Sequence, residues 1–307
     1  MDLSRVDAVK HTLSGSDHTS HVERSHDQRN YLKQQGERIY LLELQGFIFF
    51  GTANTLVEQM RERCDDPNQT RVEFAILDFR RVIGIDSSAV LSLKRLQQLM
   101  RARRITLIFT NLAEKAIWKL RGHSLLDSTN VDPLLFDDLE QGLEWCEERL
   151  LAQMPNAVEE ANLAPLGDLG SLLAKGEPGA EIWQYLERQE LSASQTLIAE
   201  GTPPMDMYFV QSGQVSVYLQ LPEGRTLRIR RMNAGTVVGE IGVYLDIPRT
   251  ATVVAEEATV VYRLSRDALN AMERDAPAVA SAFHRAMVCI QGERLASLNS
   301  LVRALLR

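Results

Sequence analysis

The sequence of 307 residues has little of several features that would assign it to a class. It holds only three cysteines, Cys64, Cys146 and Cys289, whose wide separation matches neither a zinc site nor a redox motif. No apolar run approaches the roughly 18 residues that a membrane-spanning helix needs. The polar N-terminus also lacks the apolar core of a secretory signal. We therefore expect a soluble chain whose thiols are reduced and buried, as in a cytosolic protein.

Basic charge and catalytic motifs are scarce as well. The chain has 34 Lys and Arg against 41 Asp and Glu, a net charge of -7 and a pI near 5.5. Non-specific nucleic-acid binding depends on basic surface that releases counterions, so we expect no nucleic-acid partner. The sequence contains no nucleophile elbow, P-loop or paired-histidine metal motif. We therefore expect no enzyme activity, no metal and no cofactor.

The polar N-terminal thirty residues hold four of the six histidines. Their spacing fits no common metal motif, so we predict a leader over residues 1–37 rather than a ligand cluster. The whole chain exceeds what one hydrophobic core usually organises, which predicts two domains. We place these domains at residues 38–152 and 181–307. A stretch rich in proline and glycine, residues 153–180, is the predicted linker between them.

Strands and helices alternate in the first domain. Residues 38–50 predict a hairpin of two extended runs separated by Gln45-Gly46. The apolar runs FAILDF, at 74–79, and ITLIFTNL, at 105–112, are typical of central strands buried on both faces. Helical spacing of apolar residues lies between these runs. This alternation predicts an α/β fold, a mixed sheet with packed helices.

The period changes after a predicted helix near residues 181–188. Short runs such as MYFVQSGQVSVYLQ and TVVYRL, mostly separated by turns with glycine or proline, predict a mainly-β barrel. The chain ends in a broadly amphipathic helix over residues 277–307, whose apolar stripe includes Val279, Phe283 and Met287. The second domain is therefore predicted to be a β-barrel with flanking helices.

One stretch of this barrel, GEIGVYLDIPRTATV from Gly239 to Val253, places charged residues among apolar ones. Three interpretations of Glu240 and Arg249 stay open: a structural ion pair, a solvated hairpin edge, or a pocket for a small phosphorylated ligand. Arginine can bind two phosphate oxygens at once, a short helix after Gly239 can offer backbone N–H groups, and a carboxylate can accept from a ribose hydroxyl. The glycines and Pro248, which a bare ion pair would not require, favour the pocket.

This stretch and the strands before it resemble the cyclic-nucleotide-binding domain of catabolite activator proteins, cyclic-nucleotide-gated channels and kinase regulatory subunits. The resemblance runs from near Glu181 to Leu295 and implies a cyclic-nucleotide ligand, with cAMP favoured over cGMP. It implies Glu240 as the ribose acceptor, Arg249 as the phosphate anchor and Thr250 as a hydroxyl near the phosphate or base. The implied ligand-binding residues are Gly239, Glu240, Ile241, Gly242, Arg249 and Thr250.

A second motif, VIGIDSSAVLSLKRL, begins at Val82 in the first domain. Asp86 or Ser87 can cap the following helix, and Ser88 then lies in its first turn. A capped helix start is favoured on physical grounds, while a phosphate on Ser88 would meet the positive end of the helix dipole. The domain resembles the STAS fold of anti-anti-sigma factors and of the cytosolic tails of SulP-type anion transporters. In the former, the second serine of such a DSS sequence is the phosphorylated one, which corresponds here to Ser88, although Ala89 replaces the glycine that is usual in those factors.

Further segments favour the transporter branch. LELQGFIFFGTAN, LDFRRVIGIDSSAV and LEWCEERLL resemble the SulP versions, and the leader SGSDHTSHVERSHDQRNYL resembles the link from the last membrane helix to the STAS domain. The resemblance implies a regulatory module on the cytoplasmic side of the inner membrane. Its partner would be the membrane domain of an anion (sulfate) transporter in the same parent protein, and a second copy of the chain is another candidate partner. The alternative is a freestanding signalling protein of the anti-anti-sigma type.

Overall fold

The computed structural model describes residues 8–126, 133–154 and 179–305. It divides into two compact units, of which the first comprises residues up to 20 and 31–154, and the second comprises residues 21–30 and 155–307. Most of the linker predicted for residues 153–180 lies outside the described residues. None of the described helices is long and apolar enough to cross a membrane.

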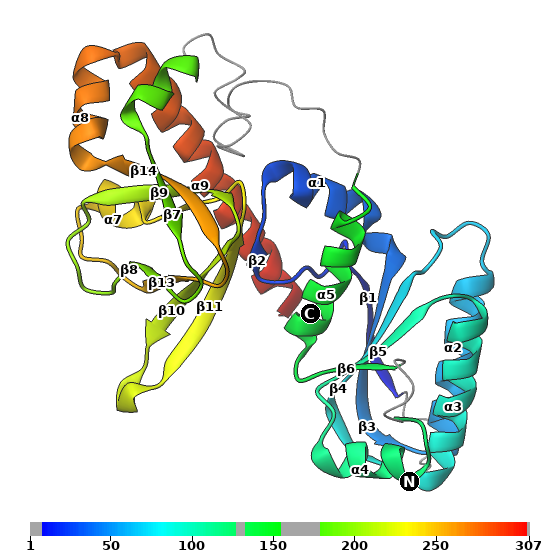
Figure 1. Cartoon of the computed structure of the whole chain (residues 1–307). Helices are drawn as coiled ribbons and strands as arrows, with labels where there is room; N and C mark the ends of the chain where they lie inside the picture. Colours follow the sequence, from blue (N-terminus) through cyan, green and yellow to red (C-terminus); the bar gives the residue numbers. More distant parts are fainter. Residues whose placement is uncertain (1–7, 127–132, 155–178, 306–307) are drawn as a thin grey trace. The chain divides into compact units, whose positions relative to one another are not determined.

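A five-stranded mixed sheet forms the centre of the first unit (Figure 1). In spatial order its strands are β1 (Val9–Ser14), β3 (Ile39–Ile48), β4 (Phe74–Ile85), β5 (Thr106–Thr110) and β6 (Leu134–Phe136). β1 is antiparallel to β3, and the other neighbours are parallel. Residues 74–79 are buried without a break, as expected for a central strand with helices on both faces.

Helices cover both faces of this sheet. Leu77 and Phe109 face a core shared with α2 (Phe50–Asp65) and α3 (Ser87–Ala102), whereas the alternate residue Ile76 faces a core shared with α5 (Leu139–Leu151). The shorter helices are α1 (His26–Gln35), η2 (Gly36–Arg38), which is a 3-10 helix, and α4 (Glu114–Gly122). The α/β fold predicted for this domain is confirmed.

The predicted hairpin over residues 38–50 is wrong. Ile39–Ile48 is one continuous strand, and Gln45-Gly46 lies in an irregular stretch whose register shifts twice against β4. Gly46 has a φ of 73°, so its conformational freedom serves a bulge instead of a turn. Phe49 then caps the N-terminus of α2, and its backbone N–H donates to the side chain of Thr52. The second run of the expected hairpin is therefore divided between the end of β3, at Phe47 and Ile48, and the start of α2, at Phe49 and Phe50.

The leader predicted for residues 1–37 also contains ordered elements. Val9–Ser14 is an edge strand because it pairs with β3, and its Val9 and Leu13 pack against the two cores of the unit. Strand β2 (Val22–Glu23) and helix α1 follow it. These residues gain their order from partners distant in the sequence, which a polar composition does not reveal.

Two sheets form the second unit, in the orders β2-β11-β10-β13-β8 and β12-β9-β14-β7. β2 runs parallel to β11, and the remaining pairs are antiparallel. Inward residues of the two sheets, such as Val210 and Val253, share one core, so the predicted β-barrel is confirmed. The strands are β7 (Glu187–Leu191), β8 (Thr196–Ile198), β9 (Asp206–Ser212), β10 (Gln214–Gln220), β11 (Thr226–Asn233), β12 (Val237–Val238), β13 (Thr252–Ala255) and β14 (Thr259–Ser265).

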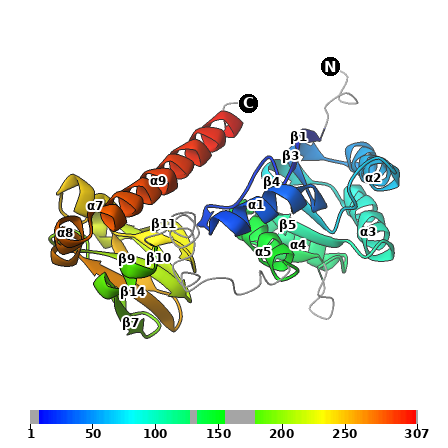
Figure 2. The ribbon, with the colours of Figure 1, turned by 90° about the horizontal axis from the view of Figure 1, so that it is seen from above.

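Helices pack against this barrel, and Figure 2 shows α7, α8 and the first part of α9 gathered beside it. Phe283 of α9 meets Phe209 of β9 edge to face, with ring centroids 6.2 Å apart. The helix predicted near residues 181–188 is a 3-10 helix that ends at Tyr185, because strand β7 already begins at Glu187. The helical elements are η4 (Gly179–Tyr185), η5 (Pro222–Gly224), α7 (Glu240–Leu245), α8 (Arg266–Asp275) and α9 (Pro277–Leu305).

Candidate functional site

Gly239 stands between β12 and the short helix α7, and its backbone is left-handed, with a φ of 85°. A Cβ atom here would lie 2.8 Å from Nη1 of Arg249 and 2.9 Å from Ile198. Gly242 is packed almost as tightly, because its Cβ would lie 3.0 Å from Cβ of Pro204. The two glycines therefore allow backbone to pack closely around the arginine side chain.

Arg249 lies inside this segment and is only 6% exposed. Its Nη1 donates to the carbonyl of Gly239 at 2.7 Å, and its Nη2 donates to the carbonyl of Asp206 at 2.5 Å. Its own backbone N–H donates to the carbonyl of Thr202. Burial lowers the pKa of Arg249, although nearby Tyr208 and other acidic groups oppose this effect. The guanidinium is thus held rigidly, with its charge removed from bulk water.

Glu240, in the first turn of α7, is 4% exposed. Its Oε1 accepts from Nε2 of Gln291 at 2.9 Å and from Nη1 of Arg294 at 2.5 Å. Both donors belong to the terminal helix α9. Oε1 of the carboxylate predicted to bind a ribose hydroxyl therefore already accepts hydrogen bonds from two side chains of the same chain.

Arg294 connects three acceptors at this point. Besides Glu240, it donates through Nη2 to the carbonyl of Val237 at 2.8 Å and through Nε to Glu23 at 3.0 Å. Its side chain is 9% exposed. Burial by itself would lower the pKa of Arg294, but the charges of Glu240 and Glu23 outweigh it and the pKa is raised. Arg294 is therefore a buried cation between two carboxylates.

Sequence reasoning missed Gln291 and Arg294. A signal was present, because Arg294 continues the apolar stripe of the terminal helix four residues after Ile290, where a core side chain is expected. A charged residue on such a stripe indicates a buried partner of opposite charge. The identity of that partner could not be inferred, since Glu240 is 54 residues away in the sequence.

Two other residues predicted to bind the ligand have side chains that are not buried. Ile241 is 48% exposed, and Thr250 is exposed. The structure therefore gathers Gly239, Glu240 and Arg249 around α7 and leaves these two side chains at the surface. Of the three interpretations of the segment, the solvated edge does not describe Glu240 or Arg249, since both are buried. Glu240 forms an ion pair with Arg294, whereas Arg249 donates to backbone carbonyls, so the two residues do not form the expected pair with each other.

In the first unit, Asp86 is the cap of helix α3. Its Oδ1 accepts from the backbone N–H of Ala89 at 2.7 Å and from the hydroxyl of Ser88 at 2.7 Å. Ser88 is therefore partly buried and donates to a carboxylate. A phosphate on Ser88 would replace that donor by a second anion beside Asp86, which opposes the attraction of the helix dipole.

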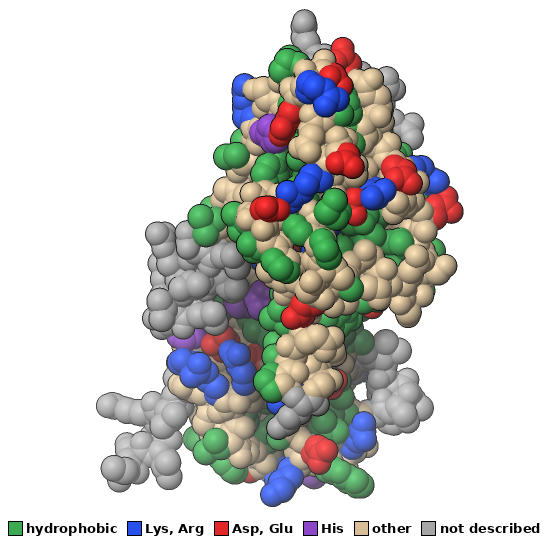
Figure 3. All heavy atoms as spheres, turned by 90° about the vertical axis from the view of Figure 1, so that its left-hand side faces the viewer, with side chains coloured by type: hydrophobic (Ala, Val, Ile, Leu, Met, Phe, Trp, Pro, Cys, Tyr) green, Lys and Arg blue, Asp and Glu red, His purple; other side chains and the backbone are tan. Residues whose placement is uncertain are grey.

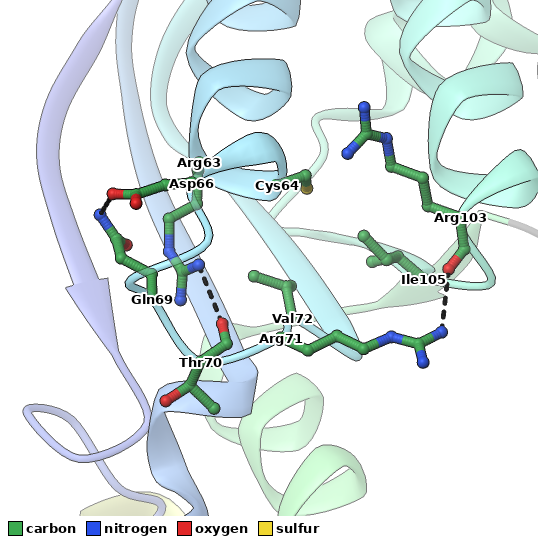
Figure 4. Close-up of a pocket in the computed structure, with 9 residues that line it drawn as sticks. All are labelled: Arg63, Cys64, Asp66, Gln69, Thr70, Arg71, Val72, Arg103 and Ile105. Atoms are coloured by element: carbon green, nitrogen blue, oxygen red, sulfur yellow. Dashed lines mark hydrogen bonds between the residues drawn. The ribbon is translucent and has the colours of Figure 1, made fainter.

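A cavity of about 330 Å³ opens at the other ends of α2 and α3 (Figure 4). Its arginines contact groups of the same unit: Arg63 donates to the carbonyl of Thr70, and Arg71 to that of Arg103. Cations at helix C-termini are stabilised by the helix dipole, so the arginines have a structural role here. Desolvation raises the pKa of the lining thiol, Cys64, more than the arginines lower it. The cavity thus presents no activated nucleophile.

The three thiols differ in exposure. Cys146 is buried and Cys64 partly buried, but Cys289 on α9 is exposed, so the prediction of three buried thiols is wrong for Cys289. Its position does not continue the stripe of Phe283, Met287 and Ile290, which faces the core. All three cysteines are free.

Two family models match the chain, one in each unit. The model of the STAS domain matches residues 30–141, and the model of the cyclic nucleotide-binding domain matches residues 188–275. The second match includes β12, α7 and Arg249, and ends before α9 begins. Both domain resemblances are confirmed, and the terminal helix lies beyond the matched range.

Three curated relatives share parts of the chain. The vacuolar basic amino acid transporter VSB1 of Saccharomyces cerevisiae is 30% identical over 161 residues, 50% of this chain and 15% of the transporter. Glutaminase 2 of Bradyrhizobium diazoefficiens is 26% identical over 290 residues, 92% of this chain and 44% of that protein. The CRP-like cAMP-activated global transcriptional regulator of Mycobacterium tuberculosis is 25% identical over 108 residues, 35% of this chain and 48% of the regulator. The chain spans less than half the length of each.

Proposed function

We propose that this chain, a STAS domain followed by a cyclic nucleotide-binding domain, is a regulatory module that senses a cyclic nucleotide and catalyses no reaction itself. One observation carries the proposal: within the matched domain, Glu240 and Arg249 are buried around α7 without pairing with each other. A buried cation and a buried carboxylate, each held by other groups, are suited to two different parts of one ligand.

The ligand would use these groups as follows. Arg249 keeps further N–H donors besides the two given to carbonyls, and these would bind the exocyclic oxygens of the cyclic phosphate. The first turn of α7 adds backbone N–H groups that have no partner within the helix. Glu240 would accept the ribose 2′-hydroxyl once Gln291 and Arg294 move away from it. Thr250, at the surface nearby in sequence, would contact the phosphate or base.

We favour cAMP over cGMP as the ligand. The M. tuberculosis relative is named for activation by cAMP, and it matches 35% of this chain. A calorimetric titration with both nucleotides tests the preference. The proposal predicts binding of cAMP at one site in each chain and weaker binding of cGMP.

The proposed context is a membrane transporter of the SulP type, with the module on the cytoplasmic side of the inner membrane and the membrane domain as partner. The match to a vacuolar transporter over half of this chain supports a transporter. That relative is named as a transporter of basic amino acids, so the transport of sulfate or another anion rests on the sequence resemblance alone. No nucleic-acid partner is proposed, and Figure 3 shows acidic and basic side chains interspersed on the face in view.

A second context is favoured by a different observation. The glutaminase match covers 92% of this chain and so includes both domains. In that context the same module would regulate an enzyme domain in place of a transporter. Sequencing the genomic reading frame before Met1 separates the two, because a transporter predicts a long series of hydrophobic segments and a glutaminase predicts a globular catalytic domain. A short frame beside a kinase-like gene would instead favour the freestanding anti-anti-sigma type.

A further inference from the structure

A short N-terminal segment, residues 21–30, belongs to the second unit although it precedes the STAS domain in the sequence. Its strand β2 adds to the edge of the barrel, where Val22 and Glu23 align in parallel with Arg231 and Met232 of β11. A register of two residues gives little attachment through the backbone, so side chains must supply most of it.

Glu23 supplies one such attachment. Its carboxylate, 13% exposed, accepts from Nε of Arg294 at 3.0 Å and forms an ion pair with Arg230 at 3.3 Å. Arg29 supplies another, because its Nη2 lies 2.6 Å from the carboxylate of Glu293 on α9. Segment 21–30 therefore forms ion pairs with two consecutive residues of the terminal helix, Glu293 and Arg294.

The same guanidinium of Arg294 holds Glu240. A guanidinium is planar and rigid, so its donors to Glu23, Glu240 and the carbonyl of Val237 have a fixed relation to one another. Arg294 cannot leave Glu240 without changing its geometry toward Glu23. The predicted ribose acceptor and the N-terminal segment thus share one cation.

We infer that residues 21–30 form a latch on the ligand site, because the segment holds Arg294 against Glu240. A ligand that binds Glu240 in place of Arg294 would release the segment from the barrel. The latch rests on the proposed function, because it requires the ligand to compete for Glu240. The occupant of the β11 edge is this chain's own segment, whose Glu23 matches the basic Arg230 and Arg294 there.

Coupling of this kind is reciprocal. If the ligand weakens attachment of the segment, then attachment of the segment weakens binding of the ligand by the same factor. Glu23→Gln removes the charge that holds Arg294 and should therefore tighten cAMP binding. Couplings between sites are typically about 5- to 150-fold, so we expect an increase in affinity of about fivefold or more.

Glu187→Gln is a matched control. Glu187 is also a strand carboxylate of this unit that is paired with an arginine, Arg263, at 2.9 Å. Its partner Arg263 is in β14, which belongs to a different sheet from β2, and Arg263 keeps a second ion pair, with Asp206, when Glu187 is replaced. The same loss of one negative charge should leave cAMP affinity unchanged here.

The test combines calorimetric titration of the full chain with hydrogen exchange of the wild type, each with cAMP. The latch predicts tighter binding by Glu23→Gln than by wild type or Glu187→Gln, and faster exchange in residues 21–30 of the wild type when cAMP is added. The exchange measurement needs no variant, so a misfolded Glu23→Gln protein does not remove the test. Equal affinities together with unchanged exchange in residues 21–30, while cAMP binds, would overturn the latch and leave the proposed function standing. Absence of cAMP and cGMP binding to every form would overturn both.

Discussion

Replacing Arg249 tests its proposed role in ligand binding and its contribution to the fold. Charge-assisted hydrogen bonds contribute about 1.5–3 kcal/mol each, and about 1.4 kcal/mol corresponds to a tenfold change in affinity. Arg249→Ala removes the cation proposed to bind the phosphate, so the dissociation constant for cAMP should rise by about tenfold or more. Calorimetric titration of the folded variant gives this ratio directly.

The structure adds a second effect of this substitution, on stability. Arg249 donates to the buried carbonyls of Gly239 and Asp206. Each carbonyl left without a donor costs about 1–3 kcal/mol, so we expect the alanine variant to lose about 2 kcal/mol or more of unfolding free energy. Urea denaturation measures that loss.

Arg249→Lys is the sharper variant, because it retains the charge but loses the paired donors of the guanidinium. We expect its affinity to lie between those of wild type and Arg249→Ala. Arg188→Ala, at a half-exposed arginine paired with Glu190, is the control and should change neither affinity nor stability appreciably. An Arg249→Ala protein that is folded and binds cAMP as tightly as wild type would refute the assignment of Arg249.

Three other predictions follow from the described residues. Gly239→Ala should destabilise the chain more than Gly224→Ala, since both glycines have positive φ but only the first would bring a Cβ within 4 Å of other atoms; chemical denaturation of both variants measures the difference. Ser88 should be mainly unmodified in protein from its native host, and a dominant phosphorylated species in an intact-mass spectrum would contradict this. Alkylation of native protein should reach exposed Cys289 before Cys146, whose pKa burial raises, and peptide mass mapping over time shows the order.

Much of the α/β unit could be predicted because its central strands are continuous apolar runs, as expected for a sheet covered on both faces. The error at Gln45-Gly46 has a local cause. A glycine between two apolar runs is compatible with a turn or a bulge, and only the pairing of Ile39–Ile48 with β4 distinguishes them. The strand Val9–Ser14 was not predicted, because it is stabilised by pairing with β3, which is distant in the sequence.

The geometry of the segment from Gly239 to Val253 was predictable to the extent that residue type constrains the local backbone. The backbone of Gly239 has the left-handed conformation that glycine permits, and its carbonyl accepts a hydrogen bond from the side chain of Arg249. The partners of Glu240 were not predictable, because Gln291 and Arg294 come from a helix 51 and 54 residues away. Local pattern identifies which residues carry chemistry, whereas the pairing of charges depends on tertiary contacts.

Titration of the full chain with cAMP and with 2′-deoxy-cAMP tests the central claim most directly. The two nucleotides share the cyclic phosphate proposed for Arg249 and differ only in the hydroxyl proposed for Glu240. The account predicts that cAMP saturates one site in each chain and that the deoxy nucleotide binds about tenfold more weakly, the effect of one hydrogen bond to a charged group. No detectable binding of cAMP, or equal affinity for the two nucleotides, would contradict it.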